Sequence, residues 1–381
     1  MSQPTPLSIL GTPARAPLPH IPPDIAGLAD YERHARAHMP AHAWSHIASG
    51  ADQELTLRHN RSAFDALRLV PEPLADLSGA HTRQTLLGQE LVAPILLAPL
   101  AYLRLAHEQG DLAAVRAAMA LQTGMVVSTL SSHSLEDIAQ AARAASTELG
   151  RSAPLWFQLY SQPERSSTLA LIRRAEDAGY QALVWTVDAH IKRSSYPLPE
   201  GVTAANLREL PTPPRHHTDL MDRHILFGTA LAIQAPSWDE LAWLRAQTRL
   251  PVIVKGILSA TAAARAVALG ADAIVVSNHG GRVLDGMVAT IEVLPALRAA
   301  VPRHVPLLLD SGVRYGTDIL KALALGASAV MVGRPIFHAL AVAGMLGVAH
   351  MLHLLRAELE LTMAQTGCCT LEQIAPSLLA R

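Results

Sequence analysis

Eight short apolar segments, each followed by a helical pattern, constrain the fold of this chain more than any other feature. They lie between residues 95 and 332 and lack the alternation of apolar and polar residues that marks a half-exposed strand. Continuous apolar runs of this kind are typical of parallel strands, which are buried on both faces. We expect strands at Ile95–Ala98, Val126–Thr129, Leu155–Tyr160, Ala182–Val187, Val252–Lys255, Ala273–Ser277, Leu307–Asp310 and Ala329–Val332.

The helical patterns between these segments end at residues that stop helices for steric reasons. Glycine follows Ser167–Ala178, Ala260–Leu269 and Asp318–Leu325, and a proline follows shortly after Ser237–Arg249 and Ile291–Ala300. Eight strand–helix units predict a (β/α)8 barrel. A doubly wound open sheet is the rival, but no glycine-rich phosphate turn follows the first strand.

The pattern predicts one barrel domain over residues 24–381, preceded by a flexible or extended proline-rich arm over residues 1–23. A helical segment is expected after Asp30, before the first strand. The long stretch Ser194–Ser237, rich in proline, histidine and arginine, falls after the fourth strand. A loop of this length in a compact domain is usually a lid, a substrate-binding loop or disordered.

Composition excludes several classes of protein. The chain has 31 basic and 32 acidic residues, so it lacks the positive excess of a dedicated nucleic-acid binder. We find no run of about 18 apolar residues, the length of a membrane helix. The N-terminus does not resemble a secretory signal, so a cytoplasmic protein is expected.

No metal site is predicted. The adjacent Cys368 and Cys369 fit neither a disulfide framework nor a metal knuckle. Histidines recur every four residues from His34 to His46, but Pro40 interrupts the register and no cysteine or carboxylate supports a site.

Polar residues gather at the carboxyl ends of six predicted strands. In a barrel of this kind those ends face the active site, and buried charge is costly unless it is paired or binds a ligand. The six ends therefore predict a ligand site at one mouth of the barrel. They are Gln158–Tyr160, Thr186–Asp188, Lys255–Gly256, Ser277–Arg282, Asp310–Arg314 and Gly333–Pro335.

The last two ends have the composition of an anion site. Gly312 and Gly333 would allow a close approach of the backbone, and Arg314 and Arg334 would add positive charge. In many barrels the loops after strands seven and eight hold a phosphate. The bland alternative is two ordinary turns with surface arginines.

Two further residues suggest chemistry. Lys255 is one of only three lysines beside 28 arginines, which indicates a need for a compact charge. Its role would be a Schiff base, or a cation beside a ligand that gains negative charge; an incidental lysine is the alternative. His279 lies among glycines, and Asp188, two strands away, could orient it as a base. A purely structural histidine is the alternative.

The segments Ser277–Arg282, Asp310–Asp318 and Gly333–Pro335 resemble those of the FMN-dependent 2-hydroxy acid oxidase and dehydrogenase family, which includes glycolate oxidase, lactate oxidase and mandelate dehydrogenase. The likeness extends from about Asp30 to Ile374. It implies a (β/α)8 barrel with FMN at the carboxyl-terminal mouth and the oxidation of a 2-hydroxy acid to a 2-oxo acid. The electron acceptor would be oxygen, a quinone or a carrier protein, and a homo-oligomer, often a tetramer, is expected.

Carried over residue by residue, the resemblance implies cofactor contacts along much of the mouth. They are the backbone of Ala98, Pro99, Leu100 and Ala101, and the residues Ser128, Gln158, Thr186, Lys255, Ser277, Asp310, Gly312, Arg314, Gly333 and Arg334. His279 would take a proton from the substrate while Asp188 pairs with its imidazolium, and two electrons would reach flavin N5. Tyr160 would hydrogen-bond the substrate, and Arg282 would bind its carboxylate bidentately.

Two positions depart from the family pattern. His46 stands where a tyrosine usually contacts the substrate carboxylate, and Ser195 stands where a second carboxylate-binding arginine is usual. Arg193, two residues earlier, is the candidate replacement. The departures keep two alternatives open. One is an FMN oxidoreductase acting on a non-standard alcohol or tailored metabolite, and the other is a flavin-binding protein with little turnover.

Overall fold

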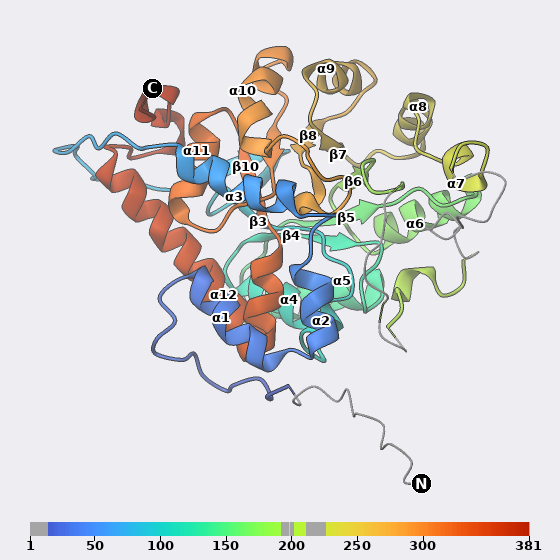
Figure 1. Cartoon of the computed structure of the whole chain (residues 1–381), viewed down its shortest axis with the longest axis horizontal. Coiled ribbons are helices and arrows are strands. Elements are labelled where there is room, and N and C mark those ends of the chain that lie inside the picture. Colours follow the sequence, from blue (N-terminus) through green and yellow to red (C-terminus); the bar gives the residue numbers. More distant parts are fainter. Residues whose placement is uncertain (1–13, 192–197, 199–201, 211–225, 381) are drawn as a thin grey trace, which may run out of the picture.

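The computed structural model describes residues 14–191, 198, 202–210 and 226–380, and its centre is a closed barrel of eight parallel strands (Figure 1). The strands follow one another around the barrel in chain order, and the last pairs with the first. The predicted (β/α)8 fold and all eight predicted strands are confirmed, with small differences at the strand ends. The strands are β3 (Ile95–Leu97), β4 (Gly124–Ser128), β5 (Leu155–Leu159), β6 (Leu183–Thr186), β7 (Val252–Ile257), β8 (Ala273–Val276), β9 (Leu307–Leu309) and β10 (Ala329–Val332).

Helices surround the barrel and cover the outer face of its strands (Figure 1). The strands lack polar alternation because side chains on both of their faces are buried, outward against the helices and inward around Trp156. The surrounding helices are α4 (Gly110–Ala120), α5 (Leu135–Leu149), α6 (Arg165–Asp177), α7 (Ala230–Ile233), α8 (Trp238–Gln247), α9 (Ala260–Ala268), α10 (Thr290–Ala300), α11 (Gly316–Ala324) and α12 (Arg334–Gln365).

Local signals in the sequence set several helix ends. The Ser134 side chain accepts a hydrogen bond from the backbone nitrogen of Asp137 at 3.1 Å and so caps α5. Gly150 ends the same helix in the left-handed conformation, and Gly179 follows α6.

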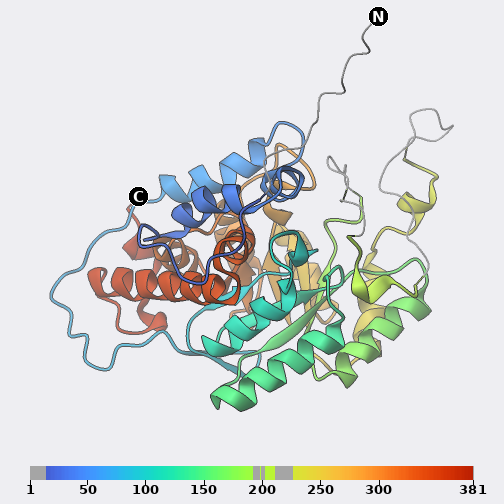
Figure 2. The same ribbon diagram turned by 90° about the horizontal axis from the view of Figure 1, so that it is seen from below.

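The segment before the barrel supplies helices α1 (Leu28–His38), α2 (Ala41–Ala48) and α3 (Leu55–Ala66). Figure 2 shows these N-terminal helices on one side of the molecule, where α1 packs against α12. The described part of the predicted arm is extended and attached, because backbone nitrogens of Arg15 and Leu18 donate to carbonyls of Ala37 and Val342.

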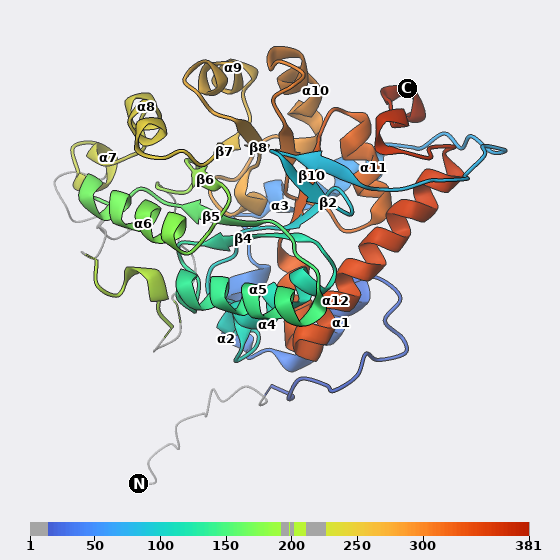
Figure 3. The same ribbon diagram turned by 180° about the vertical axis from the view of Figure 1, so that it is seen from behind.

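A two-stranded hairpin that the sequence did not suggest covers the end of the barrel where the strands begin. Its strands are β1 (Gln84–Leu86) and β2 (Gln89–Leu91), and Figure 3 shows it beside β10. Leu86 and Leu91 pack into the barrel interior, and Gln89 accepts a hydrogen bond from the indole of Trp156 at 2.8 Å. The hairpin therefore covers the amino-terminal end of the barrel, opposite the mouth where the polar strand ends lie.

Helix α12 corrects one expectation. The sequence was expected to hold no segment with the length and apolarity of a membrane span, yet α12 meets both, with a mean hydropathy of 1.6 over its most apolar window. Of that window 78% is buried inside the protein, and the helix bends at Ala343 and Gly344 to follow the barrel. The apolar surface of α12 is thus explained by packing against α1, α4 and α11.

His338 is an unusual member of this buried helix. Its ring is 1% exposed and stacks on Trp44, with ring centroids 5.6 Å apart. Neither ring nitrogen has a hydrogen-bond partner among the described residues. Burial, together with the nearby charges of Arg314 and Arg334, lowers the pKa of His338 to about 3.

His338→Phe is expected to stabilise the protein, and more so in acid. A buried polar group without a partner costs roughly 1–3 kcal/mol. Below the usual histidine pKa of 6.5, His338 binds a proton in the unfolded chain but not in the folded protein. The wild type therefore loses stability as the pH is lowered from 6.5 to about 3. The free-energy advantage of phenylalanine should grow by about 2 kcal/mol between pH 7.5 and pH 5. Urea unfolding at both pH values measures it, and an advantage that stays constant would contradict this description of His338.

Candidate active site

A cavity of about 500 Å³ opens at the carboxyl-terminal mouth of the barrel. Its walls come from the ends of the strands and from α2 and α12. Most of the predicted site residues line it together: His46, Ala98, Pro99, Leu100, Ala101, Ser128, Gln158, Tyr160, Thr186, Lys255, His279, Arg282, Asp310, Gly312, Arg314, Gly333 and Arg334.

Two of the predicted residues that the structure describes, Ser277 and Asp188, are not part of this wall. Ser277 is fully buried behind Lys255, and Asp188 lines a neighbouring cavity while it contacts His279. Arg193 and Ser195 lie outside the described residues. The sequence reasoning also missed wall residues, because Tyr102, Leu198 and Phe337 carry no polar motif that would single them out.

The centre of the possible chemistry is the pair formed by His279 and Asp188. Nδ1 of His279 lies 3.0 Å from Oδ1 of Asp188. Burial opposes ionisation of Asp188, but His279 and Lys255 outweigh it and lower the pKa of this carboxyl. Asp188 is therefore an anion that can orient the imidazole and stabilise its protonated form.

His279 is held in place by its own backbone. It adopts a left-handed conformation (φ +57°), and its backbone nitrogen donates to the Ser277 hydroxyl at 3.1 Å. Next to it, the Asn278 amide exchanges two hydrogen bonds with the Asn60 amide on α3. The loop that carries the histidine is thus tied both to β8 and to the N-terminal helices.

Tyr160 lies on the same wall as a neutral phenol. Burial raises the pKa of Tyr160, and the negative charge of Asp188 raises it further. The phenol consequently keeps its proton at neutral pH and can donate a hydrogen bond to a ligand.

Lys255 places a buried positive charge on the cavity wall. Its Nζ lies 3.0 Å from Oδ2 of Asp310 and 2.8 Å from the Ser277 hydroxyl. Burial disfavours the ammonium, yet the carboxylates of Asp310 and Asp188 prevail and raise the pKa of Lys255. A raised pKa makes Lys255 a poor nucleophile for a Schiff base and favours the alternative, a cation beside an anionic ligand.

Two buried polar atoms on this wall lack partners and point to a ligand. Gln158 Nε2 and Thr186 Oγ1 have no hydrogen-bond partner among the described residues. The Oε1 atom of Gln158 accepts from the Ser128 hydroxyl at 3.0 Å, which leaves the amide nitrogen as a donor. These atoms, with Lys255, suit the polar edge of a flavin ring because they offer donors and a cation in one row.

The far end of the cavity suits a phosphate. Burial lowers the pKa of Arg314, and burial with the charges of Arg282 and Arg314 lowers that of Arg334 to about 9. Crowded cations of this kind favour an anion between them. Gly333 precedes α12, and a Cβ there would meet no atom closer than 3.7 Å, so space adjoins the start of this helix.

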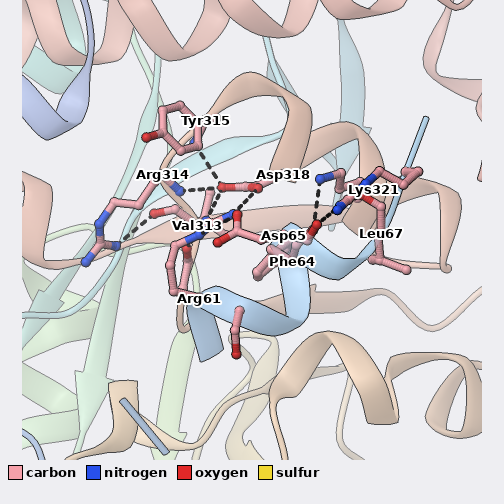
Figure 4. A network of polar contacts seen from close by, with 12 residues as sticks. Arg61, Phe64, Asp65, Leu67, Val313, Arg314, Tyr315, Asp318 and Lys321 are labelled. Carbon is pink, nitrogen blue, oxygen red and sulfur yellow. Dashed lines mark hydrogen bonds and ion pairs between the residues drawn. The ribbon is translucent and has the colours of Figure 1, made fainter. Parts of the chain in front are cut away.

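A network behind the phosphate end, shown in Figure 4, was not recognised as functional from the sequence. Arg61 on α3 forms a two-pronged ion pair with Asp318 on α11 and donates to the carbonyl of Gly312 at 2.7 Å. Asp318 also accepts from the backbone nitrogens of Arg314 and Tyr315. Arg61 and Asp318 therefore fix the loop that presents Gly312 and Arg314 to the cavity.

The part of the chain that the structure describes contains no cluster of three or more histidine, cysteine or acidic residues able to hold a metal. His38 instead hydrogen-bonds the carbonyl of Ala16, and His34 pairs with Asp24. Two of the four regularly spaced histidines thus make ordinary structural contacts.

Comparison with known proteins identifies the family. A family model described as FMN-dependent dehydrogenase matches residues 35–381. An L-lactate oxidase of Alicycliphilus denitrificans is 47% identical over 366 residues, which is 94% of this chain and 97% of that enzyme. Human 2-hydroxyacid oxidase 1 is 39% identical over 94% of this chain and 97% of its own length. A solved structure of mandelate oxidase with benzoyl-formic acid matches 93% of this chain and 98% of that chain, with 40% identity and a TM-score of 0.80.

The cavity and these comparisons agree. The chemistry of the cavity wall fits a flavin mononucleotide, and the match to the family model covers nearly the whole barrel and the helices before it. This chain belongs to the family of FMN-dependent dehydrogenases.

Proposed function

We propose that this protein oxidises a 2-hydroxy acid to the corresponding 2-oxo acid, with FMN bound in the cavity as the first electron acceptor. The observation that carries the proposal is His279, which lines the cavity together with Lys255 and the phosphate-end arginines and pairs with Asp188 at 3.0 Å. The names of the relatives, which include lactate, glycolate, 4-hydroxymandelate and 2-hydroxyacid oxidases, support this substrate class.

FMN, when bound, supplies the two-electron acceptor that amino-acid side chains lack. Gln158, Thr186 and Lys255 would hold its ring, and Arg314 and Arg334 would hold its phosphate. Lys255 stabilises negative charge that develops beside it, because its ammonium is buried and protonated.

His279 acts as the general base. Since Asp188 bonds Nδ1, the substrate hydroxyl would give its proton to Nε2, and the carboxylate would stabilise the imidazolium that forms. The substrate would lose the hydrogen and the electron pair of the adjacent C–H bond to bound FMN. Tyr160, which keeps its proton, donates a hydrogen bond to a substrate oxygen.

The substrate carboxylate would be bound beside α2. The Arg282 guanidinium lies in the cavity wall and donates through Nη1 to the carbonyl of Ser49 at 2.8 Å, which fixes its place. His46 lines the same cavity and is proposed as the second carboxylate contact. A contribution by Arg193 belongs to the proposal only, because that residue lies outside the described part of the chain.

The relatives favour a 2-hydroxy acid over a non-standard alcohol, and the ordered base argues against a protein that merely binds flavin. Molecular oxygen is the proposed final acceptor, since these relatives are named oxidases; a quinone or a carrier protein is the alternative. The cytoplasmic location and the homo-oligomer expected from the sequence stay predictions.

Anaerobic bleaching of the flavin tests the function. FMN-loaded protein is mixed with a panel of small and aromatic 2-hydroxy acids, their methyl esters and simple alcohols, and the flavin absorbance is followed. We expect rapid bleaching by at least one free acid and slow bleaching by its ester, because the ester loses the charged contact to Arg282. Bleaching by alcohols or esters alone would contradict the proposed substrate class, and no bleaching at all would contradict the activity.

A further inference from the structure

Strand β7 contains one extra residue, Gly256, where it reaches the active site. Lys255 pairs with Val275 of β8 and Ile257 pairs with Val276, so Gly256 has no partner position on that strand. Two residues opposite one is the pattern of a β-bulge, which re-aims side chains and is frequent beside active sites. The bulge gives Gly256 a φ of +106°, a conformation that residues with a Cβ rarely adopt.

Gly256 lies directly against the side chain of Asp188. A Cβ at position 256 would lie 2.6 Å from both Cβ and Cγ of Asp188 and 3.0 Å from its backbone nitrogen. Carbon atoms in contact are about 3.5–4.0 Å apart, so any side chain at this position would displace the carboxylate.

Few other contacts hold this carboxylate in place. Oδ1 of Asp188 bonds His279, whereas Oδ2 is buried and has no hydrogen-bond partner within the described ranges. The position of a carboxylate with one bonded oxygen depends on packing, because a single hydrogen bond leaves it free to turn. Gly256 forms the wall against which Asp188 packs.

We infer that Gly256 is a positioning residue for proton transfer, a role that rests on the function proposed above. The missing side chain lets Asp188 sit beside Nδ1 of His279. The same bulge leaves Lys255, the residue before it, on the cavity wall in contact with Asp310. Gly256 itself does not line the active-site cavity, and we assign its effect on proton transfer to its direct contact with Asp188.

The test is Gly256→Ala in the FMN-loaded protein, with flavin reduction measured across pH. Reduction should slow by about 10- to 100-fold, a part of the roughly 100- to 10,000-fold effect of a positioned base. The rising limb of the pH profile of kcat/KM should also move to lower pH, because a carboxylate favours the protonated form of a neighbouring imidazole. A wild-type rate with an unmoved limb would overturn the inference, as would a slower rate with an unmoved limb.

Gly179→Ala is the matched control. Gly179 also has a positive φ, +85°, but a Cβ there would meet no atom within 4 Å, and it follows α6 at the opposite end of the barrel. The control carries similar backbone strain without the collision, so its reduction rate and pH profile should equal those of the wild type. A shift as large as that of Gly256→Ala would assign the effect to strain and reject the positioning role.

A double mutant tests whether Gly256 affects the rate through Asp188 or by another route. In an Asp188→Asn background, Gly256→Ala should cost little further rate, because both changes remove the same contact. If the two substitutions slow reduction by factors that multiply in the double mutant, Gly256 acts by a route other than Asp188.

If Gly256→Ala does not yield folded, FMN-binding protein, Asp188→Glu carries the test. Asp188→Glu lengthens the side chain that packs against Gly256, so this variant should move the carboxylate away from Nδ1 of His279, slow reduction and move the limb to lower pH. A wild-type rate and pH profile of Asp188→Glu would contradict the close packing of Asp188 against Gly256. Failure of every 2-hydroxy acid to reduce the wild-type flavin would instead reject the proposed function, so the two failures are distinguishable.

Discussion

His279→Ala is expected to leave FMN bound and to slow flavin reduction by about 100- to 10,000-fold, the usual effect of a general base. The loss follows because Asp188 orients this imidazole. Apart from His46, no other described histidine lines the cavity. Stopped-flow absorbance under anaerobic conditions with a saturating 2-hydroxy acid measures the rate.

The exposed His304, in the loop that leads into β9, provides the control for this change. His304→Ala should reduce at the wild-type rate and bind FMN equally well. Reduction of the His279→Ala flavin at a rate near that of the control would remove His279 from the role of base.

Arg61→Met is expected to lower the free energy of unfolding by about 3–5 kcal/mol, the usual cost of leaving a buried charge without its ion-pair partner. Asp318 has a side chain only 1% exposed, and Arg61 is its ion-pair partner (Figure 4). The loss should extend to FMN affinity, because Arg61 also holds the carbonyl of Gly312 on the cavity wall.

Arg58→Met is the control for the second prediction, since Arg58 is exposed and lies one turn earlier on α3. Its unfolding free energy should stay within about 0.5 kcal/mol of the wild type. Arg61→Lys should restore part of the stability, because it returns the charge without the bidentate geometry. An Arg61→Met protein as stable as Arg58→Met would contradict the importance of the pair with Asp318.

The barrel could be predicted from the sequence because its determinants are local. Each strand is a short run buried on both faces, and glycine or proline marks the ends of the helices between strands. The hairpin Gln84–Leu91 escaped notice because its strands have only three residues each, too few to show a period.

The gathering of Gln158, Lys255, His279 and the last two strand ends at one mouth could be predicted because they are polar positions at strand ends, where the fold brings them together. His46, Ser128 and the segment Ala98–Ala101 were expected only from the family resemblance.

The contacts that hold the site residues in place could not be predicted. The pair between Arg61 and Asp318 joins residues 257 positions apart, and the contact of Gly256 with Asp188 depends on a bulge that no sequence pattern announces. Long-range packing of this kind becomes visible only when the strands are placed side by side.

A titration of the apoprotein with FMN tests the central claim most directly, because every role assigned to the cavity requires the flavin to be there. We expect quenching of flavin fluorescence that saturates at a single FMN for each chain. Lys255→Met apoprotein should bind more weakly, since it loses the buried ammonium. Apoprotein that leaves flavin fluorescence unchanged at every concentration, although folded, would contradict the account.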